Sequence, residues 1–482
     1  MRSKSIAQNA LFNIIRVTVI LLLPIVVFPY VSRKLGPVSL GRVDFAESVV
    51  SYFVMIAAMG IPAYGKIVCA KARQSEEELQ KTVCELIYLN FALEVIAYSA
   101  LILTIFLVPK LHQYRAILIL NSLAVLVSVI SVEWLYVALE KFRYIAIRSI
   151  MLKFISVILI FALIRSPDDY IWYTGINIFF VVGSALMDFI LAHRYIHFYN
   201  PKELDISRHI APVLVFFASS VAITISSNTD IVMLNLFDGE YQTGLYTFSV
   251  RIKSMLVSLM VAGLDVVVPR LSMLHKEGFH DDFRSLIKTA GIFTFVVSCA
   301  IASYFIVFSN ETVCILGGSE YASAAYIVIV FMLCMIVLSV NFTLGVGVLQ
   351  VIGRERLFAR ALLLACLFNV VANCILIPAI HATGAALATL LSECVILFLF
   401  YKYCRDYIGG AFAGCHLTLV AAAAGFAGII CRIGKGYILQ GNPLLQMIFF
   451  LVVFMIIYCP LIYAVSSETR EFVKDLISKK GA

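Results

Sequence analysis

The stretch FPYVSRKLGPVSLGRVDFAESVVSYF, residues Phe28 to Phe53, contains the end of one apolar segment and the start of the next. The first segment closes around two prolines, a basic turn follows, and the second segment opens with Asp44 and Glu47, three residues apart. An ionised group inside a bilayer is costly, so two carboxylates at the start of an apolar segment require a structural or functional reason.

The composition around this stretch is that of an integral membrane protein. Of 482 residues, 62% are hydrophobic and 14% are charged, and the mean hydropathy is +0.98. A spanning helix needs about 20 apolar residues because it rises about 1.5 Å per residue across about 30 Å of hydrocarbon. The chain is therefore predicted to be all-α with about 14 spans: residues 11–31, 43–64, 84–108, 116–138, 146–164, 171–192, 209–236, 244–268, 286–308, 322–350, 358–379, 383–402, 411–431 and 445–465.

The distribution of basic residues predicts the orientation. With both termini in the cytoplasm, 25 of the 37 Lys and Arg residues fall in cytoplasmic segments, 8 fall on the opposite side and four fall inside helices. This asymmetry is the positive-inside pattern. The formal charge of +8 is thus explained by topology, and we expect no nucleic-acid partner.

Motifs for catalysis or metal binding are missing from the sequence. The twelve cysteines include no C-x-x-C pair and no cluster at metal-ligand spacing. The chain also has no P-loop, no Gly-rich dinucleotide turn and no H-E-x-x-H motif. We therefore expect a carrier, not an enzyme, with no cofactor and no metal.

An internal repeat organises the chain. At an offset of 203 residues, GRVDFAESVVSYFVMIAAMG (Gly41 to Gly60) aligns with GLYTFSVRIKSMLVSLMVAG (Gly244 to Gly263) without a gap and with five identities. The offset predicts an N-terminal lobe of six helices at 1–204, a C-terminal lobe of six at 205–405, and two further helices with a tail at 406–482. Because six is even, the lobes are parallel repeats, as in transporters with a central cavity.

Several of these stretches resemble a known family. The stretch from Phe28, followed by GIPAYG (Gly60 to Gly65), resembles the opening of the Wzx-type oligosaccharide flippases of the polysaccharide transporter family. Three later stretches resemble its helices 5, 8 and 12: FRYIAIRSIMLKFISVILIFALIRSPDDYIWYTGIN from Phe142, TGLYTFSVRI from Thr243, and HATGAALATLLSECV from His381. The superfamily also contains the lipid II flippase and the multidrug and toxin extrusion antiporters.

This resemblance implies a multi-pass protein of the bacterial inner membrane. Such a carrier moves undecaprenyl-pyrophosphate-linked oligosaccharide repeat units, used for lipopolysaccharide and other polysaccharides, from the cytoplasmic to the periplasmic leaflet by alternating access. It also implies two lobes around a central cavity and two C-terminal helices that form a lipid-facing groove. Partners would be the lipid-linked glycan, membrane lipid, and a polysaccharide polymerase or chain-length regulator.

Four cations lie inside predicted spans and are candidates for binding the substrate diphosphate. They are Arg251, Arg16, Lys153 and Lys253. Intramembrane cations normally face protein or water, and Arg offers paired hydrogen bonds to phosphate oxygens. Residues two apart on a helix point in different directions, so we expect Arg251 rather than Lys253 to face the cavity. Arg16 and Lys153 could instead extend to the cytoplasmic interface.

Five carboxylates are candidates for coupling transport to a proton or sodium gradient. They are Glu47, Asp44, Glu94, Asp230 and Glu393. A carboxylate within a span must be paired, hydrated or protonated. Glu47 and Asp44 share a helix face that Ser51 continues, and Glu47 is the better candidate for the cavity. Asp44 could simply begin a helix, where the dipole favours a carboxylate.

Two prolines are candidates for a hinge. Pro24 and Pro29 lie in the first span, where each removes a backbone hydrogen bond and permits a kink. Bending at this point would open one face of the cavity.

Two alternatives remain at this level. A drug or cation antiporter on the same fold would favour an apolar, acidic cavity. A membrane-embedded glycan polymerase or ligase would carry a large outer loop, and here the connections are short.

The predicted orientation can be tested with single cysteines and a thiol reagent that does not cross membranes. In intact cells, Ser39→Cys and Asp168→Cys should react, whereas Glu77→Cys and Glu355→Cys should react only after lysis. Labelling of Glu77→Cys in intact cells would reverse the orientation.

Overall fold

The computed structural model describes residues 2–193, 195, 199–200, 203–409, 416–437, 442–465 and 470; it describes no side chains at residues 2–15, 17, 20–22, 262–263 and 265–266. Within this described part the secondary structure is entirely helical, which confirms the all-α fold class. The chain forms two compact units, residues 1–244 and 245–482. The predicted lobe boundaries at residues 204 and 405 stay predictions.

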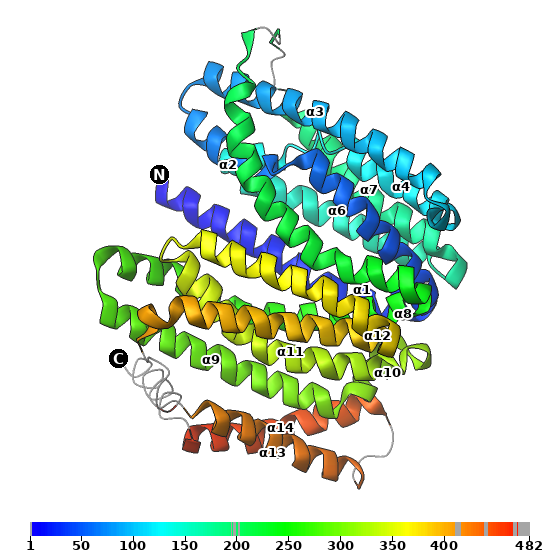
Figure 1. Ribbon diagram of the computed structural model, residues 1–482, viewed down its shortest axis with the longest axis vertical. Coiled ribbons are helices and arrows are strands. Elements are labelled where there is room, and N and C mark those ends of the chain that lie inside the picture. The colour runs from blue at the N-terminus through cyan, green and yellow to red at the C-terminus, as the bar shows by residue number, and fades with distance from the viewer. Residues whose placement is uncertain are drawn as a thin grey trace. The chain divides into compact units, whose positions relative to one another are not determined.

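Unit 1 is a bundle built around α1 (Figure 1). The helix α1 contacts α3, α4 and α6, while α7 contacts α4 and α6, and α2 contacts α3 and α5. The elements are α1 (Arg2–Ala58), α2 (Ile61–Ala72), α3 (Glu76–Leu107), η1 (Pro109–Tyr114), α4 (Arg115–Leu126), α5 (Glu133–Ala138), α6 (Phe142–Leu163), η2 (Pro167–Asp169), α7 (Tyr170–Ala192) and the first part of α8 (Ser207–Glu277).

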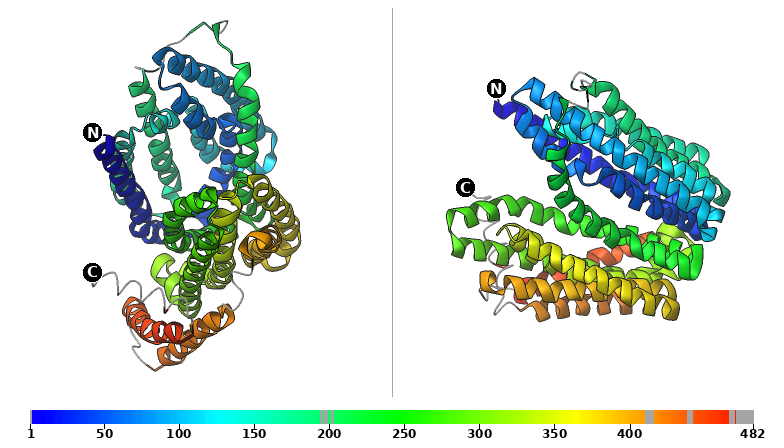
Figure 2. Two further views of the ribbon diagram at one scale, coloured as in Figure 1. Left: turned by 90° about the vertical axis from the view of Figure 1, so that its left-hand side faces the viewer. Right: turned by 45° about the horizontal axis from the view of Figure 1, so that its top comes forward.

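Unit 2 continues along α8 and packs α11 between α9 and α12 (Figure 2). The last two helices pack on each other, and α13 also lies along α9. The remaining elements are α9 (His280–Val307), α10 (Ser309–Gly317), η4 (Ser319–Tyr321), α11 (Ala324–Leu344), the π-helical turn η5 (Gly345–Gln350), α12 (Glu355–Ile408), α13 (Leu417–Lys435) and α14 (Pro443–Val465).

Three long helices each contain two predicted spans. Non-helical backbone interrupts α1 at Gly36, α8 at Gly239 and α12 at Ile380 and His381. Ten stretches of the described chain are long and apolar enough to cross a membrane, and several of them contain one of these interruptions. The total of fourteen spans stays a prediction.

The interruptions in α1 and α8 are related by the internal repeat. Gly36 has φ 71° and Gly239 has φ 80°, a region that glycine adopts without steric cost. The two positions are 203 residues apart, which is the offset of the repeat. Equivalent residues of the two repeats therefore make the same backbone turn, and this supports the repeat alignment.

A reciprocal close contact joins α1 and α8 within unit 1. A Cβ atom added at Gly41 would overlap the carbonyl oxygen of Glu240, and one added at Gly244 would overlap the carbonyl oxygen of Pro37. Gly41 is equivalent to Gly244 and Pro37 to Glu240 at the same offset, so the contact has an approximate two-fold symmetry. Small residues permit such close approach of helix backbones. Arg42 adds an ion pair to Glu240 at 2.8 Å.

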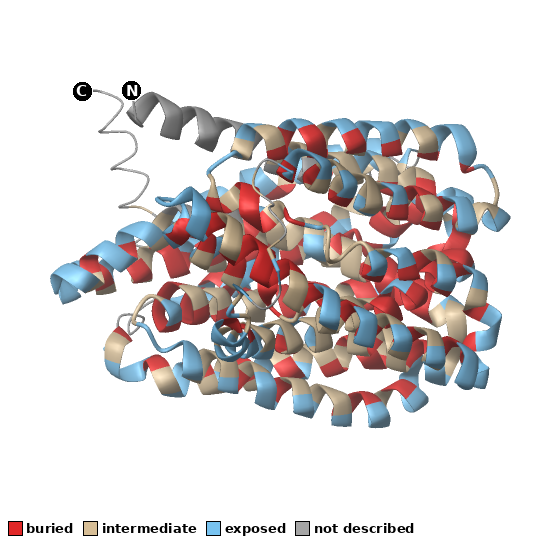
Figure 3. Ribbon diagram, turned by 90° about the horizontal axis from the view of Figure 1, so that it is seen from above, coloured by how far each residue is buried: buried red, intermediate tan, exposed pale blue. Residues whose placement is uncertain are grey.

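Each unit has apolar side chains both inside and outside. Phe45, Leu101 and Leu118 pack inside unit 1, and Ile287, Leu349 and Phe400 pack inside unit 2. Large apolar side chains are also exposed along the same helices, for example Ile158 at 65% and Phe398 at 68%; Figure 3 shows exposed and buried positions along the same helices. Exposed apolar surface of this extent is expected for helices that face lipid.

The structure refines two details of the sequence analysis. The described break in α1 lies at Gly36, whereas Pro24 and Pro29 lie within the helix, and their role as a hinge stays a prediction. Ser39 is only 6% exposed, and its hydroxyl donates to the carbonyl of Pro167 at 2.8 Å. A cysteine at position 39 is therefore a poor site for labelling, and the exposed Asp168 is the better outer site.

The reciprocal contact predicts that Gly41→Ala and Gly244→Ala will each destabilise the protein, by about 1–3 kcal/mol as for other overpacked sites. Both should lower the thermal midpoint and the yield of monodisperse protein in detergent. Gly425→Ala is the matched control, because nothing lies within 4 Å of a Cβ at that helical position. Equal stability of all three variants would refute the close contact.

Candidate functional site

Five helices of unit 1 surround a cavity of about 620 Å³. The wall is formed by the second part of α1, by α2, α4 and α7, and by the first part of α8. It is mostly apolar, with polar side chains from different elements: Glu47, Ser51, Lys66, Asn121, Ser131, Asn177, Ser220 and Thr224. A largely apolar pocket with a few convergent polar groups is the usual form of a ligand site.

The predicted shared face of Glu47 and Ser51 lies toward this cavity, because both residues line it. Asp44 is 7% exposed and lies outside the lining that the described residues form. Because the helix restarts after Gly36, Asp44 lies about two turns inside it. The helix dipole acts mainly within the first turn, so it does not account for this carboxylate.

Lys153 is one of the predicted cations, and it lies near Glu47. It lies on α6, its Nζ is 5.4 Å from the ring centroid of Phe180, and it interacts electrostatically with Glu47. Phe180 lies beside Val181, which lines the cavity. Lys153 thus lies near the cavity wall, and its contact with substrate stays a prediction.

Glu94 supports a broken helix beside the cavity. The predicted span at 116–138 is interrupted between Leu126 and Glu133. The carboxylate of Glu94 accepts hydrogen bonds from the backbone N–H of Val129 at 2.8 Å and from the hydroxyl of Ser128 at 3.0 Å. Irregular backbone at membrane depth needs such partners. This contact gives Glu94 a structural role, and its predicted role in ion coupling stays a prediction.

Arg16 belongs to a chain of ion pairs. Its Nη1 lies 3.3 Å from Glu133, which also pairs with Arg148; Arg148 in turn pairs with Asp188. The side chains of Arg148 and Asp188 are 2% and 1% exposed. The hydroxyl of Tyr144 donates to Asp188 at 3.1 Å. A buried charge persists only when it is paired, and this network satisfies that requirement.

The sequence analysis did not single out Arg148, because it lies in the first turns of α6 and was counted with the cytoplasmic charges. A signal was nevertheless available. Asp188 lies near the end of an apolar segment, and Tyr144 and Arg148 are at i and i+4 on one helix face. Which cation would reach Asp188 depends on how α6 and α7 pack.

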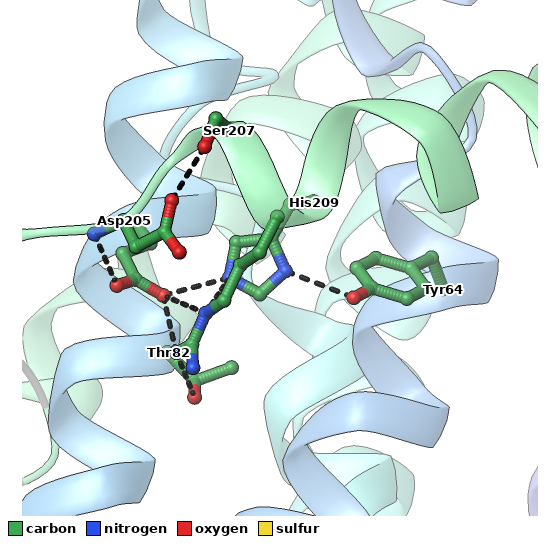
Figure 4. A network of polar contacts seen from close by, with 7 residues as sticks. Tyr64, Thr82, Asp205, Ser207 and His209 are labelled. Carbon is green, nitrogen blue, oxygen red and sulfur yellow. Dashed lines mark hydrogen bonds and ion pairs between the residues drawn. The ribbon is translucent and has the colours of Figure 1, made fainter.

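A second polar network joins α2, α3 and the start of α8 (Figure 4). The carboxylate of Glu85 lies 2.6 Å from Arg208 and 2.7 Å from a ring nitrogen of His209, and it accepts the backbone N–H of Asp205 at 2.9 Å. The other ring nitrogen of His209 lies 2.9 Å from the hydroxyl of Tyr64. This network holds α8 against α2, and both helices form part of the cavity wall.

Two of the predicted residues in unit 2 lie close to one another. The carboxylate of Glu393 on α12 accepts a hydrogen bond from Asn341 of α11 at 2.7 Å. Lys253 interacts electrostatically with Glu393, and its Nζ lies 4.4 Å from the ring centroid of Phe331. Arg251 is half-buried on α8. The functional roles of these residues stay predictions.

Asp230 lies on the part of α8 that belongs to unit 1. Its side chain is 5% exposed, and the neighbouring Thr229 bonds to the hydroxyl of Tyr52 at 3.0 Å. Asp230 lies outside the lining that the described residues of unit 1 give to the cavity. Its predicted role in ion coupling stays a prediction.

Unit 2 also has an apolar groove of about 660 Å³. Its lining comes from α9, α11, α12 and the start of α13, including Phe295, Leu344, Phe398 and Tyr401. Arg405 is the basic residue among the lining residues. The groove is therefore apolar, with one basic lining residue that also pairs with Asp406 at 3.6 Å.

Solved structures share this architecture. The structure titled "Lipid II flippase MurJ, inward closed conformation" matches with a TM-score of 0.74 at 15% identity, covering 97% of this chain and 100% of that chain. An inward-facing multidrug resistance MATE family transporter matches with a TM-score of 0.64 at 14% identity, covering 84% of this chain and 96% of that chain. The fold is that of the MurJ- and MATE-type membrane transporters.

Sequence comparison then identifies the family. The family model described as "Polysaccharide biosynthesis protein" matches residues 6–275, more than half of the chain, and the chain belongs to this family. The "Putative O-antigen transporter" of Escherichia coli (strain K12) is 22% identical over 391 residues, covering 80% of this chain and 93% of that protein. This agrees with the family predicted from the sequence motifs.

The buried ion pairs predict a strong and specific effect on stability. Arg148→Ala leaves Asp188 buried and unpaired, which should destabilise the protein by about 3–5 kcal/mol and sharply lower its thermal midpoint. The double variant Arg148→Leu with Asp188→Asn should recover most of this loss, because it removes both charges. Arg73→Ala, which breaks a solvent-exposed pair with Glu140, is the control and should cost about 1 kcal/mol or less. Failure of the double variant to recover stability would refute the pairing.

Proposed function

We propose that this protein is a flippase that translocates undecaprenyl-pyrophosphate-linked oligosaccharide repeat units from the cytoplasmic to the periplasmic leaflet of the bacterial inner membrane. The main support is family membership over residues 6–275. Sequence similarity extends to the protein named "Putative O-antigen transporter" and to a Haloferax volcanii protein named "Probable low-salt glycan biosynthesis flippase Agl15", which is 27% identical over 181 residues, 37% of this chain and 38% of that protein. The fold is shared with a lipid II flippase.

The diphosphate is the part of the substrate whose transfer across the membrane is least favourable without the protein. Its charges lose their hydration in a medium of low dielectric constant, and fixed cations can replace that hydration with charge-assisted hydrogen bonds. Every repeat unit linked to this lipid carries the same diphosphate. We assign its binding to Arg251 first, with Lys253 and Lys153 as further contacts. Arg16, which pairs with Glu133, is the fourth candidate contact.

The prenyl chain requires an apolar surface while the diphosphate moves. The groove in unit 2 provides one, and the position of Arg405 suits an anionic head group. In this proposal the prenyl chain of the substrate lies along the groove and remains partly in the membrane. The free-energy cost of crossing the membrane then comes mainly from the polar head group.

Coupling to a proton or sodium gradient is proposed through Glu47, Asp44, Glu94, Asp230 and Glu393. Neutralising a carboxylate removes the penalty for enclosing it in a dry intermediate, so ion binding would favour one conformation over another. Glu47 has the strongest structural support, because it lines the cavity and interacts with Lys153.

A drug or cation antiporter is the second candidate function. The MATE-type structures support it, because they share the fold over 84% of this chain at a TM-score of 0.64. The carboxylate of Glu47 in the cavity would also suit a cation. Uptake of an organic cation such as ethidium by proteoliposomes, without flipping of lipid-linked glycan, would favour this function over the first.

The flippase proposal predicts that Arg251→Ala will abolish or severely impair surface-glycan assembly in cells that depend on this protein. A charge-assisted hydrogen bond contributes about 1.5–3 kcal/mol, so its loss should weaken binding about ten- to a hundredfold. Arg251→Lys should restore function only in part, because the planar fork of hydrogen-bond donors is lost.

Arg356→Ala, at an exposed position in the first turn of α12, is the matched control and should behave like the wild type. Protein amounts in the membrane must be equal for all variants. Full glycan assembly by Arg251→Ala would show that this cation is not needed for transport. Flipping of the purified repeat unit in proteoliposomes, with and without imposed proton or sodium gradients, tests the activity and its coupling in one assay.

A further inference from the structure

Proline and glycine do not cause the break between α4 and α5. Residues 127–132, VSVISV, contain neither, and none of them has a positive φ. The residues at the two ends are close to helical, because Val127 has φ −97° and ψ 3° and Val132 has φ −96° and ψ 30°. Helices also break where another side chain inserts into their hydrogen-bond ladder. That explanation applies here.

Glu94 on α3 is the side chain that inserts. Its Oε2 accepts the N–H of Val129 at 2.8 Å and the hydroxyl of Ser128 at 3.0 Å. A continuous helix would direct the N–H of Val129 to the carbonyl of Val125, four residues earlier. In the structure that carbonyl accepts the N–H of Ser128 at 3.0 Å. Asn90, one turn before Glu94, donates to the carbonyl of Ser128 at 3.1 Å. The break is therefore stabilised by two side chains of α3.

The negative charge of Glu94 strengthens its bonds to the break. Its side chain is 6% exposed. Among the described residues, no charged or titratable side chain of the elements that pack on α3, which include α1, α2, α4 and η1, pairs with it. The charged residues of the adjacent cavity, Glu47 on α1 and Lys66 on α2, are not among its partners. Hydrogen bonds to an ionised acceptor are roughly twice as strong as neutral ones. A proton on Glu94 therefore weakens both bonds at once.

We propose that a proton on Glu94 controls this break. The ionised carboxylate holds residues 127–132 out of the helix, and the protonated carboxyl group allows α4 and α5 to join in one helix. A continuous helix is available because it satisfies its own backbone hydrogen bonds where water is absent. The broken form uses the charge of Glu94 and the continuous form does not, so acid favours the continuous helix and alkali favours the break.

The break lies where a change in the backbone would reach the cavity of unit 1. Val127 and Ser131, near its two ends, both line the cavity. Glu133, the first residue of α5, pairs with Arg16 and Arg148. Rebuilding the helix would move part of the cavity wall together with this ion-paired residue. The inference goes beyond the ion coupling proposed for Glu94, because it identifies the structural element that responds to the proton, and it does not depend on which substrate is carried.

Hydrogen–deuterium exchange of the full-length protein in nanodiscs, read by mass spectrometry, tests this inference. The amides of residues 127–132 report whether their backbone is helical. Near neutral pH, Glu94→Gln, which keeps the size of the side chain and removes its charge, should slow their exchange about tenfold, because two charge-assisted bonds become neutral.

The wild type supplies a second measurement that needs no variant. Exchange of residues 127–132, corrected for the chemical exchange rate at each pH, should slow toward the Glu94→Gln value on acidification from about pH 8 to about pH 5. Glu94→Gln itself should show no such dependence on pH.

Two further variants complete the experiment. Glu78→Gln is the matched control, because Glu78 is exposed in the first turn of the same helix, and exchange of residues 127–132 should match the wild type. Asn90→Leu tests the support from α3 if Glu94→Gln does not fold. It removes the bond to the carbonyl of Ser128 and should slow the exchange about fivefold while keeping its dependence on pH.

Three outcomes would overturn the proposal. Unchanged or faster exchange in both Glu94→Gln and Asn90→Leu would show that α3 does not control the break. Corrected wild-type exchange that stays constant over this pH range would exclude the proton as the ligand. Equal slowing in Glu78→Gln would show that the effect is not specific to Glu94. Because transport is not measured, each of these results would leave the proposed flippase function intact.

Discussion

The backbone must satisfy its own hydrogen bonds wherever lipid replaces water, and the rest of this structure depends on that constraint. Helices meet it along most of the described chain, and the interruptions in α1, in α8 and after α4 each have a physical explanation. Gly36 and Gly239 adopt a turn that costs glycine little. After α4, the freed backbone of the interrupted span is bonded by the carboxylate of Glu94 and by its neighbours.

The same interruptions position the functional groups. The restart of α1 after Gly36 directs Glu47 and Ser51 into the cavity, and the break after α4 leaves Asn121 on the last turns before irregular backbone. Continuous helices contribute polar lining as well: Lys66 lies on α2 and Asn177 lies on α7.

Charges within the spans divide into two kinds. Some stabilise the fold. Arg148 and Asp188 form a buried ion pair, and the carboxylate of Glu85 contacts Arg208 and His209 at the start of α8. Others face open volume, as Glu47 and Lys66 do. A membrane carrier needs both kinds, because its scaffold must withstand conformational change while its binding groups remain accessible. The desolvation cost of a buried charge therefore indicates its role only when the partner of that charge is known.

Composition and periodicity were enough to predict an all-helical membrane protein and a shared face for Glu47 and Ser51. The 203-residue offset of the predicted repeat also separates Gly36 from Gly239, where the structure shows equivalent turns. These features depend on local hydropathy and backbone geometry, which neighbouring residues encode directly. The sequence alone also carried the family motifs. It did not reveal that Arg16 pairs with Glu133 or that Glu94 supports a broken helix. Each of these facts depends on which helices pack together, and a side chain's partner across a helix interface is set by tertiary packing that no local pattern records.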